Sequence, residues 1–260
     1  WQAAGIAAEW HPEIAVFGSF NLTPPKPEAS PVTRYVGYPR MTSPARYLAE
    51  TLTVSTGTTV QALRRNNSQW QLCSAEQGWL NACFDAVVLA VPAPQAIPLL
   101  QPVHAGLADI ATSASMRGSW ALMLRYNKPL QLGFDAAFVN SGPLRWIAQN
   151  SHKPGRHGQH CWLLHADAEW SDAHIEDSAD SVAQDLLAAF AELGGPLPES
   201  WSAHRWRYAD SVNNLQLGAV WQAADNLGLC GDWLNGGKVE GAWCSGRILA
   251  GQMLASLSPA

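Results

Sequence analysis

The segment Leu227–Asp232 (LGLCGD) leads through the glycine turn Asn235–Gly237 (NGG) into a helix expected to begin near Glu240. A short buried strand that ends in Gly-Asp and leads through glycines into a helix is typical of a site that binds a phosphate-bearing ligand. The free N–H groups and the positive end of the helix dipole attract anionic oxygens there. The Asp232 carboxylate is suited to accept hydrogen bonds from ribose or ribityl hydroxyls, and the alternative is that Asp232 only caps the helix. This arrangement predicts an α/β fold with a nucleotide site at a strand end.

Regular elements extend from this segment in both directions. Apolar runs bounded by turn residues predict strands, and apolar positions spaced three or four apart predict helices. Pro92 ends a strand that is apolar on both faces, as a strand buried on both sides must be. Strands are expected at Thr59–Leu63, Trp70–Leu72, Ala86–Val91, Trp120–Tyr126, Ala136–Asn140, Arg145–Gln149 and Cys161–His165, helices at Pro44–Leu52, Asp180–Leu193 and Glu240–Leu254, and the end of an amphipathic helix at Trp1–Trp10.

Composition excludes several classes of protein. The chain has 260 residues, of which 47% are hydrophobic and 14% charged, with a formal net charge of -5. It has neither the composition of a disordered chain nor the basic excess of a nucleic-acid binder. Its five scattered cysteines contain no C-x-x-C, which argues against a disulfide framework or a zinc ribbon and favours a reducing cytoplasm. No membrane span or signal peptide is expected. The 13 tryptophans fit either a filled core or a surface that stacks flat ligands.

Three collinear stretches carry a resemblance to a known family. Cys230–Trp243 resembles the C-terminal flavin signature of the amine oxidase and renalase-like flavoproteins, whereas Asp85–Gln95 and Ala203–Ala209 narrow the resemblance to the bacterial renalase-like branch. The supporting pieces are Trp1–Gly5, Tyr35–Met41, Arg145–Asn150 and Lys153–Arg156. The resemblance covers essentially the whole chain. It implies a two-domain α/β flavoprotein with a partial Rossmann-like FAD domain and a sheet-based substrate domain.

The resemblance also implies which residues hold the cofactor, FAD. Asp232, after Gly231, would bind the ribityl chain, and Pro92 would close a strand beside the cofactor. The backbone of Val239, Glu240, Gly241 and Ala242 would face the flavin pyrimidine edge or the pyrophosphate. Val60 would meet the adenine through its main chain, and ordinary strand packing suits Val60 equally well.

One part of the family pattern is absent from this sequence. The family opens with a strand, G-x-G-x-x-G, a helix and an acidic residue for the ribose, and no G-x-G occurs in these 260 residues. We expect an N-terminal segment of about 70 residues, one βαβ unit with a connection, to be missing or removed. The expected domains are an entry segment (1–44), partial FAD-domain strands (45–96), a substrate domain (97–211) and a C-terminal FAD-domain strand and helix (212–260).

The substrate residues are expected in the run from His204 to Tyr208. His204, Arg205, Trp206 and Tyr208 are suited to hold a flat, anionic substrate, because arginine pairs with phosphate and tryptophan offers a stacking face. The alternative is a half-exposed strand, which alternates in the same way. Lys153 and Arg156 are interpreted as a solvated basic pair. No catalytic side chain is assigned, because hydride transfer to a flavin is mainly the chemistry of the cofactor.

The resemblance implies an FAD-dependent oxidoreductase that oxidises misreduced dihydronicotinamide dinucleotides with oxygen as acceptor. One alternative is a flavin amine oxidase or desaturase, and another is a non-enzymatic binding module left without the dinucleotide motif. The expected partners are oxygen and a small-molecule substrate, either a dihydronicotinamide dinucleotide or an amine. No nucleic acid, membrane or metal is expected, and the location is expected to be cytoplasmic.

Overall fold

A computed structural model describes residues 1–18, 26–27, 32–158, 160–213 and 215–257. Internal contacts divide the chain into two units. Unit 1 comprises Trp1–Val54 and Gly118–Arg207, and unit 2 comprises Ser55–Arg117 and Tyr208–Ala260. Two of the three boundaries fall inside long strands, β9 (Met116–Tyr126) and β13 (Ser200–Ser211). The four-part domain division expected from the sequence stays a prediction.

Unit 1 is built on a seven-stranded sheet of order β13-β9-β12-β11-β10-β2-β3. Only β10 and β2 are parallel among the pairs whose register is defined in the described residues, and the neighbouring pairs from β9 to β10 are antiparallel. The strands are β2 (Ile14–Phe17), β3 (Lys26–Pro27), β9 (Met116–Tyr126), β10 (Ala136–Val139), β11 (Leu144–Gln149), β12 (His160–Ala166) and β13 (Ser200–Ser211). The expected strands of this region are confirmed to within a few residues.

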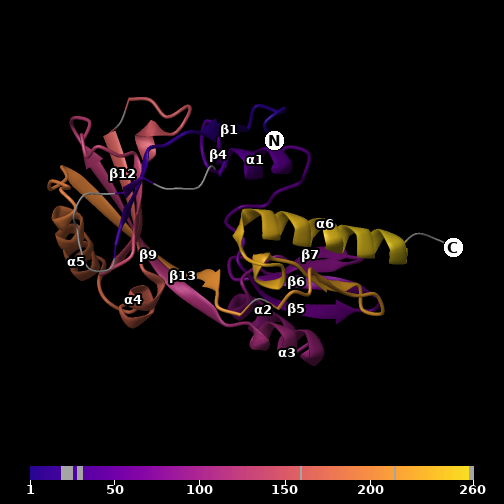
Figure 1. The fold of residues 1–260 in the computed structure, drawn as a ribbon. Helices are drawn as coiled ribbons and strands as arrows, with labels where there is room; N and C mark the ends of the chain where they lie inside the picture. The colour runs from indigo at the N-terminus through magenta and orange to yellow at the C-terminus, as the bar shows by residue number, and fades with distance from the viewer. Residues whose placement is uncertain (19–25, 28–31, 159, 214, 258–260) are drawn as a thin grey trace. The chain divides into compact units, whose positions relative to one another are not determined.

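Helix α5 (Ala179–Glu192) covers one face of this sheet (Figure 1). Its side chains Val182, Leu186 and Phe190 repeat every four residues, so they lie on one face of the helix, and all three are buried in the core with Leu122 and Leu164. Ser178 caps its first turn by accepting a hydrogen bond from the Ser181 N–H. The remaining helical segments of unit 1 are α1 (Ser43–Ala49), α4 (Ala168–Ala173) and the 3-10 turn Asn150–His152.

The expected helix at Trp1–Trp10 is wrong. Residues Ala7–Trp10 form strand β1, which pairs antiparallel with β4 (Arg34–Gly37). Trp10 is buried against Ile14 and Val36. The strand gains its backbone partners from residues more than 20 positions further along the chain, and local periodicity does not report them.

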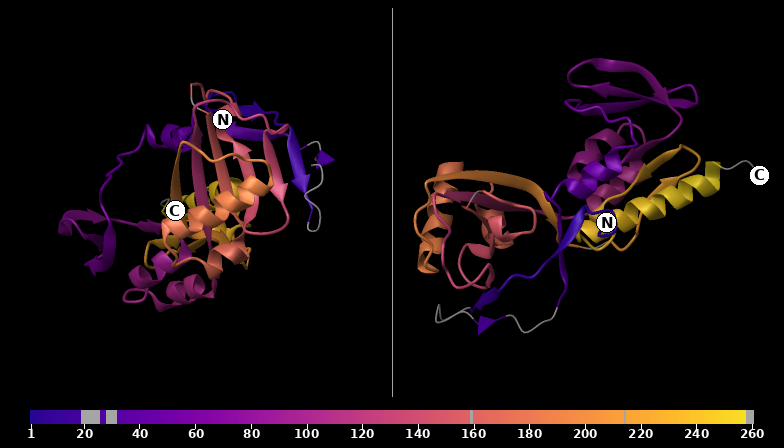
Figure 2. Two further views of the ribbon diagram at one scale, coloured as in Figure 1. Left: turned by 90° about the vertical axis from the view of Figure 1, so that its left-hand side faces the viewer. Right: turned by 90° about the horizontal axis from the view of Figure 1, so that it is seen from above.

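Unit 2 holds two small sheets. The first, of order β14-β15-β8, comprises β8 (Val87–Leu89), β14 (Val220–Gln222) and β15 (Leu227–Leu229), and β15 is parallel to β8. The second is the antiparallel sheet of β5 (Val60–Asn66), β6 (Gln69–Ser74) and β7 (Gly78–Phe84), a layer of its own beside the helices (Figure 2).

Three helices accompany these sheets. Helix α2 (Ala93–Leu100) begins directly after Pro92, α3 (Ala105–Ser113) follows it, and α6 (Lys238–Leu257) is the long C-terminal helix. The core contains Leu89, Leu100, Leu107, Leu229 and Trp233, all nearly inaccessible to solvent. The run Leu227–Leu229 is apolar throughout because β15 is covered on both faces.

All five cysteines are free thiols, as their spacing predicted. In the described part of the chain, no helix is long and apolar enough to cross a membrane. The tryptophans divide between the core and the surface. Trp10, Trp70, Trp120, Trp162 and Trp233 are buried, whereas Trp1, Trp79, Trp201, Trp206 and Trp243 are exposed.

Candidate functional site

Two parallel strands of unit 2 end side by side. Leu89 of β8 lies opposite Leu229 of β15, and the Cys230 N–H donates to the Leu89 carbonyl at 3.2 Å. Beyond the two strand ends, the Trp233 indole N–H donates to the Val91 carbonyl at 3.2 Å. Pro92 and Gly231 therefore lie at the same edge of the sheet. This is the carboxyl edge, where parallel α/β sheets bind ligands.

The turn that follows β15 is compact. The N–H groups of Asn235 and Gly237 both donate to the Asp232 carbonyl at 2.9 Å, which closes the 3-10 turn Asp232–Leu234. Gly237 and Lys238 have φ angles of 68° and 63°, in the left-handed region. A left-handed conformation costs a residue with a side chain about 1 kcal/mol or more, so Lys238 stores strain where α6 begins.

Gly241, in the first turn of α6, touches this turn directly. A Cβ on Gly241 would collide with the Asn235 carbonyl oxygen, and the Asn235 side-chain amide donates to the Gly241 carbonyl at 3.1 Å. Only glycine allows the helix to approach the turn this closely.

The Asp232 carboxylate is available for a ligand. The side chain is half-buried, and no hydrogen bond or ion pair of its carboxylate is found among the described residues. The preceding N–H, of Gly231, is satisfied by the Ser245 hydroxyl at 3.0 Å. A half-buried carboxylate without a protein partner at a strand end fits a ligand that offers hydroxyl groups. No side-chain cap by Asp232 is seen.

Of the other predicted cofactor residues, some follow this edge in α6 and one lies on another sheet of unit 2. Val239, Glu240 and Ala242 are exposed in the first turn of α6. Val60 begins β5 in the neighbouring small sheet and packs partly against the unit 2 core. The structure thus brings Pro92, Gly231 and Asp232 to one edge and places Val60 on a separate sheet of the same unit.

The predicted substrate residues lie on β13, and they do not share one face. Side chains alternate along a strand, so His204 and Trp206 point to one side and Arg205 to the other. The rings of His204 and Trp206 lie 4.3 Å apart between centroids. Arg205 donates to the Ile175 carbonyl at 2.7 Å, pairs with Glu176 at 3.3 Å, and its guanidinium carbon lies 5.5 Å from the Trp120 ring centroid.

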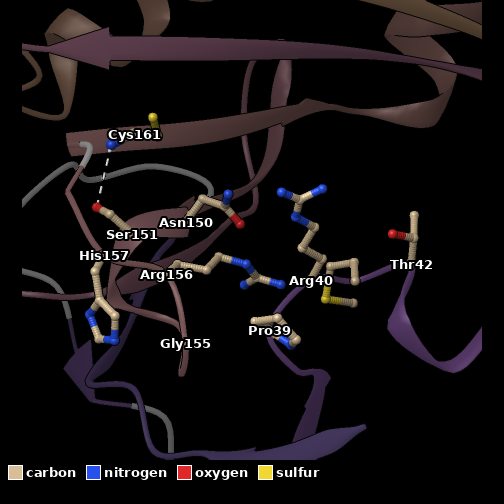
Figure 3. Close-up of a pocket in the computed structure, with 10 residues that line it drawn as sticks. Pro39, Arg40, Thr42, Asn150, Ser151, Gly155, Arg156, His157 and Cys161 are labelled. Carbon is tan, nitrogen blue, oxygen red and sulfur yellow. Dashed lines mark hydrogen bonds between the residues drawn. The ribbon is translucent and has the colours of Figure 1, made fainter.

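A cavity of about 660 Å³ lies in unit 1 (Figure 3). Two segments form it, one around the turn after β4 and one in the loop between β11 and β12. The lining residues are Pro39, Arg40, Met41, Thr42, Asn150, Ser151, Gly155, Arg156, His157 and Cys161. A second, smaller cavity of about 310 Å³ lies between β9, β12 and β13.

Lys153 and Arg156 are not a solvated pair, in contrast to the sequence interpretation. Burial, together with the positive charge of Arg156, lowers the pKa of Lys153 to about 8. The Lys153 ammonium is 3.2 Å from the Asn150 side-chain oxygen and 5.3 Å from the Trp10 ring centroid. The packing of β1 beside this loop withdraws Lys153 from water. Burial, followed by the charge of Lys153, also lowers the pKa of His165.

Arg40 and the cavity as a whole were missed by the sequence reasoning. Arg40 lies within Tyr35–Met41, a stretch that supported only the family resemblance. Its closeness to Arg156 comes from the contact of Gly155 with Tyr38 and Pro39, residues more than 100 positions away. No local signal reports that contact.

The fold and the strand-end turn define a nucleotide-binding α/β protein with a sheet-based second unit. The chain belongs to the flavin containing amine oxidoreductase family, whose model matches residues 28–254. The family is flavin-dependent and FAD is its cofactor, in agreement with the expectation from the sequence.

Solved structures share the fold at low sequence identity. A candidate protoporphyrinogen oxidase from Exiguobacterium sp. 255-15 aligns with a TM-score of 0.65 and 14% identity, covering 83% of this chain and 51% of that one. A putrescine oxidase triple mutant aligns with a TM-score of 0.63 and 16% identity, covering 86% and 54%. The wild-type putrescine oxidase bound to putrescine aligns with a TM-score of 0.61 and 15% identity, with the same coverage. The chain spans about half the length of these structures.

Proposed function

We propose that this protein is an FAD-dependent oxidoreductase of the renalase-like kind, which oxidises misreduced dihydronicotinamide dinucleotides with oxygen as acceptor. The observation that carries the proposal is the half-buried Asp232 carboxylate, without a protein partner in the described residues, at the carboxyl edge of two parallel strands. The family match agrees with that geometry. The narrower renalase-like assignment rests on the resemblance of Asp85–Gln95 and Ala203–Ala209.

The residues at the sheet edge would divide the work of holding FAD. Asp232 would accept hydrogen bonds from ribityl hydroxyls, since its carboxylate has no competing partner in the described chain. The exposed first turn of α6, at Val239, Glu240 and Ala242, would direct backbone N–H groups at an anionic or polar edge of the cofactor. Gly241 would keep that turn close to the strand end, and Pro92 and Val60 would line the neighbouring surface.

The substrate would lie against unit 1. The face of β13 that carries His204 and Trp206 offers aromatic rings on which a nicotinamide or adenine ring would stack. Tyr208, two positions further along the strand, already belongs to unit 2. Arg205 stays part of the predicted substrate set, although its guanidinium already pairs with Glu176.

When bound, FAD would supply the redox chemistry: the two electrons that leave as a hydride when the dihydronicotinamide becomes NAD(P)+ would reach oxygen, which with one proton from solvent would give hydrogen peroxide. The residues of this chain would position the cofactor and the substrate and exclude water from the reacting ring.

The second candidate is a flavin amine oxidase. The alignment with putrescine oxidase, an enzyme solved with putrescine bound, favours it. In that case the substrate would be an amine and the product an imine that hydrolyses, with hydrogen peroxide formed in the same way.

The two functions are separated by measuring oxygen consumption on flavin-loaded protein. We expect turnover with borohydride-reduced NAD, which contains the misreduced isomers, and at most one hundredth of that rate with putrescine and benzylamine. Free FAD at the same concentration is the control. The reverse ranking would establish the amine oxidase function, and no turnover with either class would contradict both.

A further inference from the structure

The cavity of unit 1 carries two arginines, and no acidic side chain stands among the described residues that line it. Figure 3 shows the Arg40 and Arg156 side chains extending into the space bordered by Asn150 and Pro39. Asp135 also lies in this region, and it is already engaged, with His152 at 3.4 Å and with the Glu13 N–H at 2.8 Å.

Arg156 has an unused donor. Its Nη1 atom is inaccessible to solvent and has no hydrogen-bond partner among the described residues, while Nη2 donates to the Gly37 carbonyl at 3.4 Å. A buried cationic N–H group without an acceptor is unfavourable, because it has lost water and gained nothing in exchange. Because Arg156 lines the cavity, a small rotation of its guanidinium would bring this donor to an anionic ligand there.

The loop that carries Arg156 is held rigidly against the turn that carries Arg40. Gly155 has a φ of 76°, and a Cβ at this position would lie 2.6 Å from the Tyr38 ring and 3.0 Å from the Pro39 Cα. Only glycine permits this contact and this backbone conformation. The two backbone segments that carry Arg40 and Arg156 are therefore in contact before a ligand binds, which reduces the entropy lost on binding.

The charge environment is cationic beyond these two residues. Lys153 lies three residues before Arg156, and its pKa is lowered by burial and by the charge of Arg156. An additional anion would relieve the mutual repulsion of these groups, whereas a cationic ligand would increase it.

We propose that this cavity binds the anionic group, a phosphate or a carboxylate, of a small molecule held between Arg40 and Arg156. Guanidinium groups pair with both anions through two parallel hydrogen bonds. The volume of about 660 Å³ lies within the range usual for small-molecule sites. Binding is a property of unit 1 alone and needs no flavin. The further step, that the bound molecule is the substrate of the oxidoreductase, rests on the proposed function.

The test is a calorimetric titration of the 260-residue chain at low ionic strength with two probes, inorganic pyrophosphate and glutarate. We expect saturable binding of at least one probe, and at least a tenfold loss of affinity in Arg156→Gln and in Arg40→Gln. The matched control is Arg145→Gln, which removes the same charge from an exposed position on β11 outside the cavity. It should bind within twofold of the unmodified chain. Pyrophosphate binding alone would identify a phosphate ligand, and glutarate binding alone a carboxylate ligand.

Two further variants keep the result interpretable. If Arg156→Gln fails to fold, judged by circular dichroism, the exposed Arg40 carries the test by itself. Asp232→Ala should leave anion binding unchanged, so that a failure of the flavin site does not imitate a failure of this one. The proposal is overturned if neither probe binds, or if Arg145→Gln weakens binding as much as the two cavity variants do.

Discussion

At the scale of one residue, Arg205 shows how a strand places residues that are adjacent in the sequence on opposite faces of the sheet. It shares its face of β13 with Arg207, and both pair with Glu176. The hydrogen bond from Arg207, with the charges of both arginines, lowers the pKa of Glu176. The aromatic side chains His204 and Trp206 occupy the other face. The contacts of Arg205 thus favour a stabilising role for its side chain.

We expect Arg205→Ala to lower the stability of the protein by about 1 kcal/mol, because the Ile175 carbonyl and Glu176 lose a charged donor. For a protein of this size the fall in Tm would be about 2–4 °C, measured by calorimetry. Arg145→Ala, at an exposed site, is the control and should leave the Tm within 1 °C, roughly the scale of a surface substitution. A raised KM for dihydronicotinamide dinucleotides, with an unchanged Tm, would instead support the predicted substrate contact.

Lys153 predicts a dependence of stability on pH. Burial lowers its pKa from the ordinary 10.5 to about 8 in the folded protein. The unfolded chain therefore holds this proton more tightly, and stability should rise as the pH increases from about 8 to about 10.5. Below pH 8 the full cost of the buried charge is present, at most about 3 kcal/mol from the pKa difference.

Lys153→Met tests this dependence by removing the charge and keeping much of the apolar length. At pH 7 the variant should be more stable than the unmodified protein, and the difference should shrink as the pH approaches 10. Urea unfolding at a series of pH values measures it. A difference that stays constant over this range would show that Lys153 is not the titrating group.

At the scale of elements, the turn between β15 and α6 does the most for the proposed chemistry. The strand ends at the carboxyl edge of a parallel pair, the glycines let the helix begin close to it, and Asp232 stands between the two. Apart from the pairing of β15 with β8, these are local relations within about 15 residues.

We expect Asp232→Ala, in protein that holds FAD, to weaken FAD binding by roughly 1–3 kcal/mol, because ribityl hydroxyls would lose a charged acceptor. Fluorescence titration of the released flavin gives the dissociation constant. Asp109→Ala removes the same charge from an exposed position on α3 and should change nothing. An unaltered dissociation constant in Asp232→Ala would limit Asp232 to a role in the turn.

The whole molecule consists of two units with separate cores, and the proposed roles divide between them. The core of unit 1 lies between the large sheet and α5, whereas that of unit 2 lies between the small sheet of β14, β15 and β8 and the helices α2 and α3. The flavin residues named above belong to unit 2, and the anion cavity belongs to unit 1. Each site can therefore be perturbed without direct damage to the other.

Because no G-x-G-x-x-G occurs in these 260 residues, we expect this chain alone to be purified with far less than one equivalent of FAD. Adding an upstream βαβ unit with that motif should give yellow protein with the flavin absorbance bands, since glycine N–H groups at a helix start bind the pyrophosphate. The same addition with the glycines changed to alanine is the control. Stoichiometric, tightly held FAD in the 260-residue chain would contradict this expectation.

The elements that local residues determine were predictable from the sequence. The apolar repeat Val182, Leu186, Phe190 predicts α5, and the run Leu227–Asp232 predicts the strand end with its carboxylate, because periodicity and turn chemistry act over a few residues. The collinear motifs indicated the flavin family for the same reason, since each is a contiguous stretch.

Only the tertiary structure decided the features that depend on distant partners. The segment Ala7–Trp10 is a strand because Arg34–Gly37 supplies its backbone partners. Lys153 is buried beside Trp10. Arg40 and Arg156 line the same cavity because Gly155 contacts Tyr38. Long-range packing sets which side chains share a space and which lose water, so neither spacing nor composition reports it.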